Sequence, residues 1–259
     1  MSVRPKKELG QHFLADPNIL DVIGRLAELE PGDIVLEIGP GLGVLTRYLA
    51  ERVGRVHTVE LDRSLEPHLA DLPSNVRLHW GDALELDLAD LEPAPNKLVA
   101  NLPYNVATPI VAESLTGLPS VELWCVMVQR EVAERFFAEP STKAYGAVSV
   151  LVQLAARRTG FHPVSRTVFR PAPNVDSALV AFRRTTLPPS FARVKQVVEA
   201  AFSHRRKTLP NSLELAGLAS RAAGATALSG LDRPGSTRAE ELAPEEFVRL
   251  AQSLATQPR

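Results

Sequence analysis

Apolar and polar positions follow one another along the chain in a pattern that predicts strands and helices in turn up to about residue 184. Short uninterrupted apolar runs indicate buried strands, whereas apolar residues spaced three and four apart indicate helices. We expect strands over residues 34–38, 56–61, 76–80, 97–100, 121–129 and 178–182. We expect helices over 17–29, 44–53 and 130–138, and a further helix that begins at Thr108 and Pro109. This order predicts an α/β fold of βαβ units, with a largely parallel sheet covered by helices on both faces.

The pattern changes beyond Thr185. Pro188 and Pro189 interrupt the chain, and only helical periodicity follows, over residues 191–202, 209–215 and 244–254. Alanine and glycine are frequent between 216 and 230, and no helix is predicted there. We therefore predict an α/β domain over residues 1–184 and a small, all-helical, basic domain over residues 185–259.

Charge is divided unevenly between these two parts. The 259 residues carry a net charge of −1. Acidic residues outnumber basic ones up to residue 180, and basic residues outnumber acidic ones after it. Basic side chains gather at Arg205, Arg206 and Lys207 in the C-terminal part and at Arg4, Lys6 and Lys7 at the N-terminus. Such clusters either neutralise nucleic-acid phosphates or form an ordinary solvated surface.

Cysteine content and the length of the apolar runs exclude several classes of protein. Cys125 is the one cysteine and lies in an apolar run, so we expect a core residue, no disulfide framework and no metal site. The N-terminal residues lack the apolar segment of a signal peptide, and no apolar stretch reaches the roughly 20 residues that cross a bilayer. We expect a cytoplasmic protein without membrane contact.

A glycine-rich segment over residues 37–43, reading E-I-G-P-G-L-G, joins the first predicted strand to the next helix. Glycines at such a place permit a tight turn and let a ligand approach the main chain closely. The G-x-G-x-G spacing differs from the G-x-G-x-x-G fingerprint of dinucleotide sites, and the preceding Glu37 would repel a pyrophosphate. The segment therefore predicts a nucleoside-containing ligand other than a dinucleotide.

Two further acids follow the next two predicted strands. Glu60 ends the second strand, about 20 residues on, where a ribose-binding carboxylate belongs in a doubly wound fold. Asp82 follows the third strand and can accept a hydrogen bond from an adenine amine. Three acids at successive strand ends suit a cationic ligand. S-adenosylmethionine carries an ammonium, a sulfonium and no phosphate, so it is the cofactor that we predict.

The tetrapeptide Asn101-Leu102-Pro103-Tyr104 lies where the fourth predicted strand ends. It offers an amide oxygen, the carbonyl of a residue with a fixed φ and an aromatic ring. These groups suit a planar base and its exocyclic amine. Asparagine and proline also favour an ordinary strand-ending turn, so the tetrapeptide alone does not decide.

These motifs, taken in order with others, resemble the KsgA-type small-subunit rRNA adenine dimethyltransferases. The resemblance is carried by residues 7–14, 37–43, 60, 82, 101–104, 129–135, 169–177 and 202–209, and it covers nearly the whole chain. It implies a Rossmann-like class I methyltransferase sheet with a helical C-terminal domain. It also implies transfer of methyl groups from S-adenosylmethionine to two adjacent adenosines in the 3′-terminal hairpin of 16S rRNA, during biogenesis of the small ribosomal subunit.

The same resemblance implies a role for each site residue. The cofactor would contact His12, Leu14, Gly39, Glu60, Asp82 and Asn101, with Glu60 on the ribose, Asp82 on the adenine and Asn101 at the methionine end. The catalytic set would be Asn101, Pro103, Tyr104 and Phe169. Arg205, Arg206 and Lys207 would bind RNA. The expected partner is 16S rRNA within an immature 30S subunit, and the expected enzyme is a monomer.

The chemistry asks mainly for positioning. An adenine amine is a weak nucleophile because its lone pair is delocalised into the ring, so the amine must be held in a reactive geometry. The Asn101 oxygen and the Pro103 carbonyl can each accept one N–H of the amine, and neither titrates near neutrality, so we expect no general base. Tyr104 would stack on the extruded base and Phe169 on its other face. Phe169 is alternatively a core aromatic.

Three other interpretations stay open at this point. An Erm-type methyltransferase of large-subunit rRNA would share the loop, the acids and an Asn-x-Pro-Tyr motif, although residues 10–14, Leu102 and residues 202–209 favour the KsgA type. A nicotinamide oxidoreductase would share the fold but lacks support from the glycine spacing. A ribosome-assembly factor that mainly binds immature subunits is compatible with catalysis.

Overall fold

The computed structural model describes Lys6 and residues 11–255 of the 259-residue chain. The chain divides into two compact units, one formed by residues 1–133 and 157–184 and the other by residues 134–156 and 185–259. Residues 134–156 group with the C-terminal residues, which the hydrophobic pattern did not indicate. The two domains predicted from the sequence, 1–184 and 185–259, stay a prediction.

The first unit is built on a seven-stranded sheet in the order β4-β3-β2-β5-β6-β9-β7. The strands are β2 (Ile34–Ile38), β3 (Arg55–Glu60), β4 (Val76–Trp80), β5 (Lys97–Asn101), β6 (Leu123–Gln129), β7 (Ala156–Val164) and β9 (Ser177–Arg184). The pairs β2–β3, β3–β4, β2–β5 and β5–β6 are parallel, and β9 is antiparallel to β6. The predicted, largely parallel α/β sheet is confirmed. Its strand order reverses direction between β2 and β5, which is where doubly wound sheets bind ligands.

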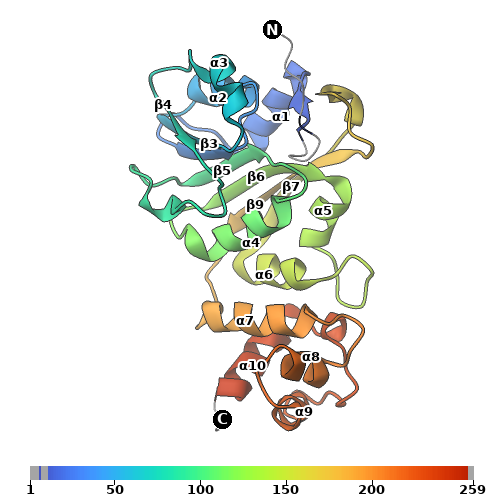
Figure 1. Ribbon diagram of the computed structural model, residues 1–259. Coiled ribbons are helices and arrows are strands. Elements are labelled where there is room, and N and C mark those ends of the chain that lie inside the picture. The colour runs from blue at the N-terminus through green and yellow to red at the C-terminus, as the bar shows by residue number, and fades with distance from the viewer. Residues whose placement is uncertain (1–5, 7–10, 256–259) are drawn as a thin grey trace. The chain divides into compact units, whose positions relative to one another are not determined.

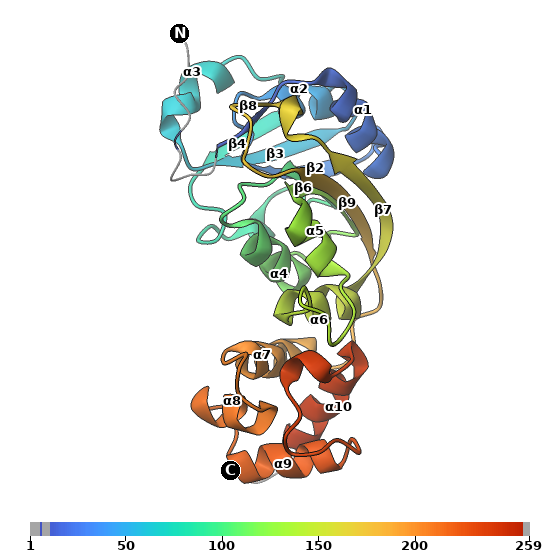
Figure 2. The ribbon, with the colours of Figure 1, turned by 90° about the vertical axis from the view of Figure 1, so that its right-hand side faces the viewer.

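Helices cover both faces of this sheet (Figures 1 and 2). On one face lie α1 (Pro17–Leu26), α2 (Val44–Ala50) and the short α3 (Glu66–Leu69), and on the other lies α4 (Ala107–Gly117). The helix α5 (Arg130–Phe136) follows β6 directly. A separate two-stranded sheet joins β1 (Phe13–Leu14) to β8 (Phe169–Arg170), and short 3-10 turns occur at Arg63–Leu65, Leu88–Asp90, Arg166–Val168 and Ala239–Glu241.

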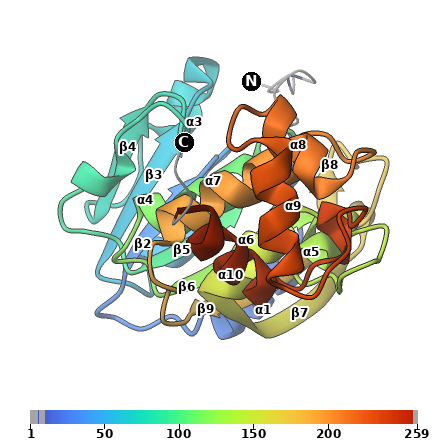
Figure 3. The same cartoon turned by 90° about the horizontal axis from the view of Figure 1, so that it is seen from below.

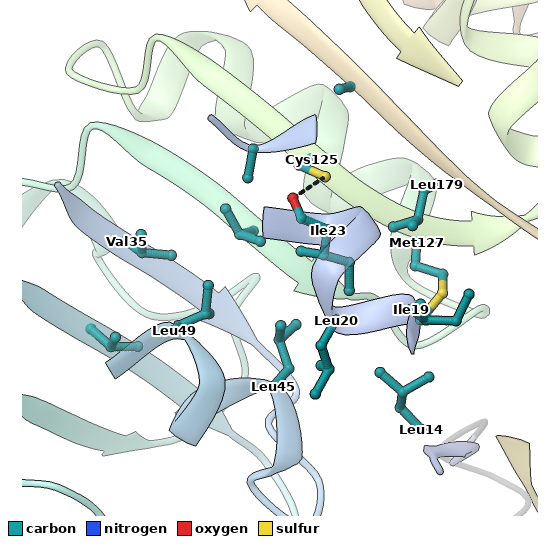
Figure 4. Packing of buried hydrophobic residues seen from close by; sticks show 14 of the residues in the cluster. Leu14, Ile19, Leu20, Ile23, Val35, Leu45, Leu49, Cys125, Met127 and Leu179 are labelled. Atoms are coloured by element: carbon teal, nitrogen blue, oxygen red, sulfur yellow. Dashed lines mark hydrogen bonds between the residues drawn. The ribbon is translucent and has the colours of Figure 1, made fainter. Parts of the chain in front are cut away.

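A hydrophobic core fills the space between the sheet and the helices α1 and α2 (Figure 4). Ile23 and Leu45 contribute from the helices, and Val35 and Leu179 from the strands. Cys125 lies in the same cluster with no exposed surface, and its Sγ is 3.9 Å from the main-chain oxygen of Ile23. The prediction of a buried core cysteine is confirmed.

The beginning of α1 is capped by its own sequence. Asp16 accepts a hydrogen bond from the main-chain N–H of Asn18 at 2.9 Å, and Pro17 occupies the first helical position. The helix ends at Leu26 and not at the predicted residue 29. Glu28 has a left-handed φ of 48°, a conformation that cannot continue a helix.

The second unit is helical apart from the first residue of β7. Its helices are α6 (Ala147–Ala155), α7 (Phe191–Phe202), α8 (Leu209–Leu215), α9 (Arg221–Ser229) and α10 (Pro244–Ala255), with residues 134–136 of α5 (Figure 3). The predicted helices over 191–202 and 209–215 are confirmed, whereas α6 and α9 were not predicted. Tyr145 is fully buried here, and its hydroxyl donates to the main-chain oxygen of Leu242 at 2.8 Å. No helix in the described part of the chain is long and apolar enough to cross a membrane.

One arginine at the end of β9 holds the C-terminal end of α4. Arg184 donates to the main-chain oxygens of Leu115, Leu118 and Val121 at 2.9, 2.8 and 2.6 Å. Leu115 lies in the last turn of α4, where carbonyls have no partner within the helix, and Leu118 and Val121 lie in the connection to β6. All three residues are buried, so water reaches their carbonyls poorly. The guanidinium carbon also lies 4.8 Å from the ring centre of Trp124.

We expect Arg184→Met to lower the free energy of unfolding by about 2 kcal/mol, because buried carbonyls lose charged donors. Urea denaturation followed by circular dichroism measures the change. Arg183→Met is the matched control: Arg183 pairs at 2.6 Å with Glu28, which is half exposed, and a surface pair contributes only about 0–1 kcal/mol. Equal losses of unfolding free energy in the two variants would show that the carbonyl contacts of Arg184 contribute no more than a surface ion pair.

Candidate active site

A pocket opens at the edge of the sheet where β2, β3, β4 and β5 end. Parallel strands bring their carboxyl ends to one edge, so the residues that follow them lie side by side. The pocket has a volume of about 1070 Å³, part of it open to solvent. Eight of the residues predicted for the site line it: His12, Leu14, Gly39, Glu60, Asp82, Asn101, Pro103 and Tyr104. The structure thus brings together side chains from five separate segments of the sequence.

The glycine loop lies directly against two other walls of this pocket. Gly39 and Gly41 have φ values of +76° and +57°, which residues with a Cβ atom rarely adopt. A Cβ on Gly41 would lie 2.9 Å from Cδ1 of Phe13, and one on Gly39 would lie 3.3 Å from the Pro103 ring. Glycine is therefore required here for close approach as well as for the turn.

Two buried glutamates stand on neighbouring strands at the pocket. Glu60 accepts from the main-chain N–H of Asp62 at 2.8 Å and of Gly41 at 3.3 Å, and burial raises its pKa above the ordinary value. Glu37 is 1% exposed, and burial raises its pKa from 4.5 to about 7, with the charge of Glu60 adding to the shift. Among the described residues, no hydrogen-bond partner reaches its Oε2 atom. A cationic ligand in the pocket would favour the ionised form of both glutamates.

The Asn101 side chain has one end fixed and the other end free. Its Nδ2 donates to the main-chain oxygen of His12 at 3.1 Å. Its Oδ1 is buried and has no hydrogen-bond partner among the described residues. A buried acceptor without a partner costs free energy, so its presence in the pocket indicates a ligand that donates a hydrogen bond there.

The main chain of Leu102 and Pro103 is also fixed. The N–H of Leu102 donates to the Met127 oxygen at 3.0 Å, and the Leu102 side chain is 1% exposed. The Pro103 carbonyl accepts from the N–H of Val106 at 3.1 Å. A carbonyl oxygen has two lone pairs, so this bond sets the direction of the carbonyl and leaves a second site for another donor.

The Tyr104 ring is anchored at its hydroxyl. That hydroxyl lies 2.5 Å from the Oγ of Ser177, which has no exposed surface, and burial raises the pKa of Tyr104. The His12 ring lies 5.4 Å from the Tyr104 ring, at an angle of 31°. Nδ1 of His12 is 2.9 Å from the Pro171 carbonyl, and because a carbonyl only accepts, this nitrogen carries the proton. No role of its own was predicted for Ser177 from the sequence, although this residue ends the segment 169–177.

Phe169 lies apart from this group. It pairs with Leu14 across β1 and β8, is 1% exposed and belongs to the hydrophobic core. It is not among the residues that line the pocket. The position agrees with the alternative of a core aromatic, and stacking on a base stays a prediction that requires the ring to move.

We expect Ser177→Ala to lower the free energy of unfolding by about 1–3 kcal/mol, because it leaves the Tyr104 hydroxyl without its partner. Tyr104→Phe leaves the buried Ser177 hydroxyl unpaired in the same way. Removing both partners leaves no unsatisfied group, so the double variant should lose clearly less than the sum of the two single losses. Thermal denaturation of the four proteins measures this, and an additive result would rule out the coupling.

The basic cluster predicted to bind RNA lies in the second unit, in the turn after α7. Arg205, Arg206 and Lys207 are all exposed. Arg205 is partly engaged, because its Nη2 donates to the Tyr145 main-chain oxygen at 3.2 Å and lies 3.7 Å from Glu240. At the other end of the chain, Arg4 and Lys7 lie outside the described residues, and Lys6 forms an ion pair with Asp62 at 2.7 Å.

The pocket residues fit a nucleoside ligand that carries a positive charge. Glu37, Glu60 and Asp82 supply carboxylates, and the glycine loop supplies exposed main chain. Among the described residues, no group of three or more His, Cys, Asp or Glu side chains is placed to hold a metal ion. The arrangement can bind a cation at the ends of β2 to β4 and present an amine to it from the end of β5.

The sequence is similar to one family over almost its full length. The sequence model of the family described as ribosomal RNA adenine dimethylase matches residues 3–256. The protein named ribosomal RNA small subunit methyltransferase A from Rubrobacter xylanophilus is 50% identical over 251 residues, 95% of this chain and 94% of the relative. The protein of that name from Thermobifida fusca is 46% identical, over 97% of this chain and 91% of the relative.

Two solved structures share the fold. A dimethyladenosine transferase from Plasmodium falciparum has a TM-score of 0.74 and 26% identity, and the match covers 92% of this chain and 96% of that one. The 23S rRNA methyltransferase ErmE has a TM-score of 0.63 and 30% identity, with coverage of 94% and 100%. These similarities confirm the predicted Rossmann-like methyltransferase sheet with a helical C-terminal region.

Proposed function

The chain belongs to the ribosomal RNA adenine dimethylase family, and on this premise we propose that its pocket holds S-adenosylmethionine beside the amine of an rRNA adenine. It is an S-adenosylmethionine-dependent rRNA adenine N6-dimethyltransferase. Its substrate is 16S rRNA, in agreement with the name of the relatives that are 50% and 46% identical. The observation that carries the assignment of the site is the unpaired Oδ1 of Asn101 at the end of β5.

The cofactor would be held by the ends of the first three parallel strands. Glu60 would accept from the ribose hydroxyls and Asp82 from the adenine amine. Gly39 would lie against the methionine part, with His12 and Leu14 closing the pocket from the N-terminal segment. When bound, S-adenosylmethionine supplies a methyl group on a positively charged sulfur, which is already a good leaving group. The carboxylates of Glu37 and Glu60 suit that charge.

The adenine amine would be held by two acceptors that this structure fixes in direction. Asn101 Oδ1 and the second lone pair of the Pro103 carbonyl would each accept one N–H. With both hydrogens engaged, the nitrogen lone pair is directed away from the acceptors. Neither group takes up a proton near neutrality, so the residues orient the amine and do not act as a base. The Tyr104 ring, fixed through Ser177, would support the base by stacking.

The RNA would be bound with the help of the second unit. Its exposed cluster Arg205, Arg206 and Lys207 suits phosphates, and Arg206 and Lys207 are the two members without a structural contact to Tyr145. The proposed substrate is 16S rRNA within an immature 30S subunit, bound by a monomeric enzyme. A role in assembly that rests on binding alone can exist beside catalysis.

Charge removal tests the proposed RNA contact. We expect Arg206→Gln/Lys207→Gln to weaken RNA binding and to reduce the slope of log K against log salt by about 1 for each lost phosphate contact. Fluorescence anisotropy with an RNA fragment at several salt concentrations measures the slope. Arg221→Gln is the control, because Arg221 is exposed on the same unit but stands outside the cluster. An unchanged slope in the double variant would leave these residues as surface charges only.

Label mapping tests the function directly. The protein is incubated with methyl-labelled S-adenosylmethionine and small subunits that lack the modification, and the labelled nucleotides are located. Label on adenine N6 in the 3′-terminal hairpin of 16S rRNA is expected, and label absent from adenine amines would refute the proposal. Large subunits serve as the parallel substrate because ErmE, a 23S rRNA methyltransferase, shares the fold. Label on 23S rRNA would favour that second candidate function.

A further inference from the structure

Asp62, a buried carboxylate outside the predicted site, accepts four hydrogen bonds. Asp62 lies two residues beyond Glu60, and its side chain is 2% exposed. Oδ1 accepts from Lys6 Nζ at 2.7 Å and from the main-chain N–H and hydroxyl of Ser64 at 3.0 and 2.6 Å. Oδ2 accepts from Gln11 Nε2 at 2.8 Å. Burial acts to raise the pKa of Asp62, but these bonds hold it well below its usual range.

Two of these donors come from the N-terminal segment, more than 50 residues away in the sequence. Lys6 and Gln11 are also tied to each other, because the main-chain N–H of Lys6 donates to Gln11 Oε1 at 2.9 Å. Gln11 and the residues directly after it, His12, Phe13 and Leu14, line the pocket. Asp62 therefore fixes the point at which the N-terminal segment enters the wall of the pocket.

On its other side, Asp62 contacts the acid proposed to bind the ribose. The main-chain N–H of Asp62 donates to Glu60 Oε1 at 2.8 Å. Any movement of Asp62 would move this donor as well as the anchor of the N-terminal segment. Asp62 thus contacts both Glu60, at the cofactor end of the pocket, and the N-terminal segment whose residues 11–14 line the pocket.

The N-terminal segment in turn sets the orientation of the amide that would hold the amine. The main-chain oxygen of His12 accepts from Asn101 Nδ2 at 3.1 Å. This bond places nitrogen on the His12 side and leaves Oδ1, the acceptor, unpaired in the pocket. Among the described residues this is the one hydrogen bond of the Asn101 side chain, so its loss would let the amide turn over and point its NH₂ group at the N–H groups of an amine, which would repel them.

We propose that Asp62 is a positioning residue for methyl transfer: by anchoring Lys6 and Gln11 beside Glu60, it holds the His12 carbonyl against Asn101 so that the amide oxygen faces the adenine amine. The inference rests on the proposed function of the pocket. The chain of contacts runs from Glu60 through Asp62, the N-terminal segment and His12 to Asn101. It connects the cofactor end of the pocket with the amine end, so both respond to the same ion pair.

A residue with a purely structural role would give a different result from a positioning residue. Its replacement would change thermal stability, or affinity for the cofactor, without changing turnover at saturation. A positioning residue changes kcat when both substrates saturate the enzyme, because the amine is then bound but poorly oriented. The kcat and KM values must therefore be measured separately for the cofactor and for the small subunit.

Lys6→Met is the first variant, because Lys6 is 42% exposed in its side chain and its replacement does not leave a cavity. We expect kcat to fall about tenfold at saturating substrates, with thermal stability nearly unchanged. Lys6→Arg, which keeps the charge and the donors, should restore most of the activity. Asp62→Asn should lower kcat at least as much, because it weakens the contacts to Gln11 and Ser64 as well. Lys6→Met/Asp62→Asn should lose no more than the larger single loss, since both changes remove the same Lys6–Asp62 ion pair.

Asp71→Asn is the matched control. Asp71 also pairs with a cation, Arg47 at 2.7 Å, but it is 83% exposed and does not line the pocket. Its kcat should equal that of the parent protein. Unchanged kcat in Lys6→Met, or a change confined to thermal stability or to KM, would overturn the proposal. A parent protein that does not methylate adenine would instead refute the proposed function, so the two failures are distinguishable.

Discussion

Asn101→Ala is expected to lower kcat by about a hundred- to a thousandfold, while cofactor and RNA affinities change only a few-fold. The side chain offers the amine an acceptor that is buried, unpaired and already oriented by its bond to His12. An acceptor that is fixed before the reaction costs no reorganisation, and removal of one such group typically has an effect of this size. Single-turnover methylation at saturating cofactor and small subunits measures the loss, and anisotropy measures binding.

Two further variants make this result specific. Asn101→Asp keeps an oxygen acceptor but loses the N–H that donates to His12, so a carboxylate would face the His12 carbonyl and the activity should stay low. Asn18→Ala is the control for the loss of an exposed asparagine amide, since Asn18 lies at the start of α1 and its side chain donates a hydrogen bond to Asp16 at 2.9 Å. Turnover at the parental rate in Asn101→Ala would remove Asn101 from its proposed role.

The strands β2 and β5 could be predicted because each carries a short apolar run with a polar residue near its end, whereas β3 and β4 mix apolar and polar positions. Residues 34–38 and 76–80 were predicted with their observed bounds, and Glu37, Glu60 and Asn101 follow from the rule that parallel strands end at one edge. That rule needs no knowledge of side-chain packing. This is why the order of the acids and the place of Asn101 were accessible from the sequence.

The helix α9 was missed for a physical reason that involves Gly224. Glycine between 216 and 230 lowers the helix propensity, and alanine, although a strong helix former, adds little hydrophobic contrast, so the region shows no clear helical periodicity. In the structure a Cβ on Gly224 would lie 3.0 Å from the Cα of Pro210. The glycine therefore permits close packing of α9 on α8. A hydrophobic pattern cannot predict such a contact, because glycine has no side chain to contribute to the pattern.

The supports of the site were missed because their contacts join distant parts of the sequence. Asp62 bonds to Gln11 across 51 residues, and Tyr104 bonds to Ser177 across 73. Phe169 could be read as a stacking residue or as a core residue until its pairing with Leu14 placed it in the core. Residue types that carry chemistry are visible in a sequence, whereas the groups that orient them depend on tertiary structure.

Glu37→Gln is expected to stabilise the cofactor-free protein by about 3 kcal/mol at pH 8 and by less than about 1 kcal/mol at pH 5. Burial raises the pKa of Glu37 in the folded protein to about 7, against 4.5 for an ordinary glutamate. The folded state therefore binds more protons than the unfolded state between these pH values, and the parent protein loses stability as the pH rises through them. Glutamine has no charge to bury, so its advantage grows over the same interval. Urea denaturation between pH 5 and 8 measures it, with the exposed Glu51→Gln as a control.

Cofactor binding should offset this pH dependence, because a cationic ligand lowers the free-energy cost of the buried carboxylate. The hydroxyls of Thr46 and Thr58 already act to lower the pKa of Glu37, but burial and the charge of Glu60 outweigh them. A bound positive charge adds an attraction that favours the ionised form. The affinity of the parent protein for S-adenosylmethionine should therefore rise by up to tenfold per pH unit between pH 5 and 7 and then level off. Calorimetric titrations of Glu37→Gln should show a flat profile, and a slope equal to that of the parent would mean that another group binds the proton.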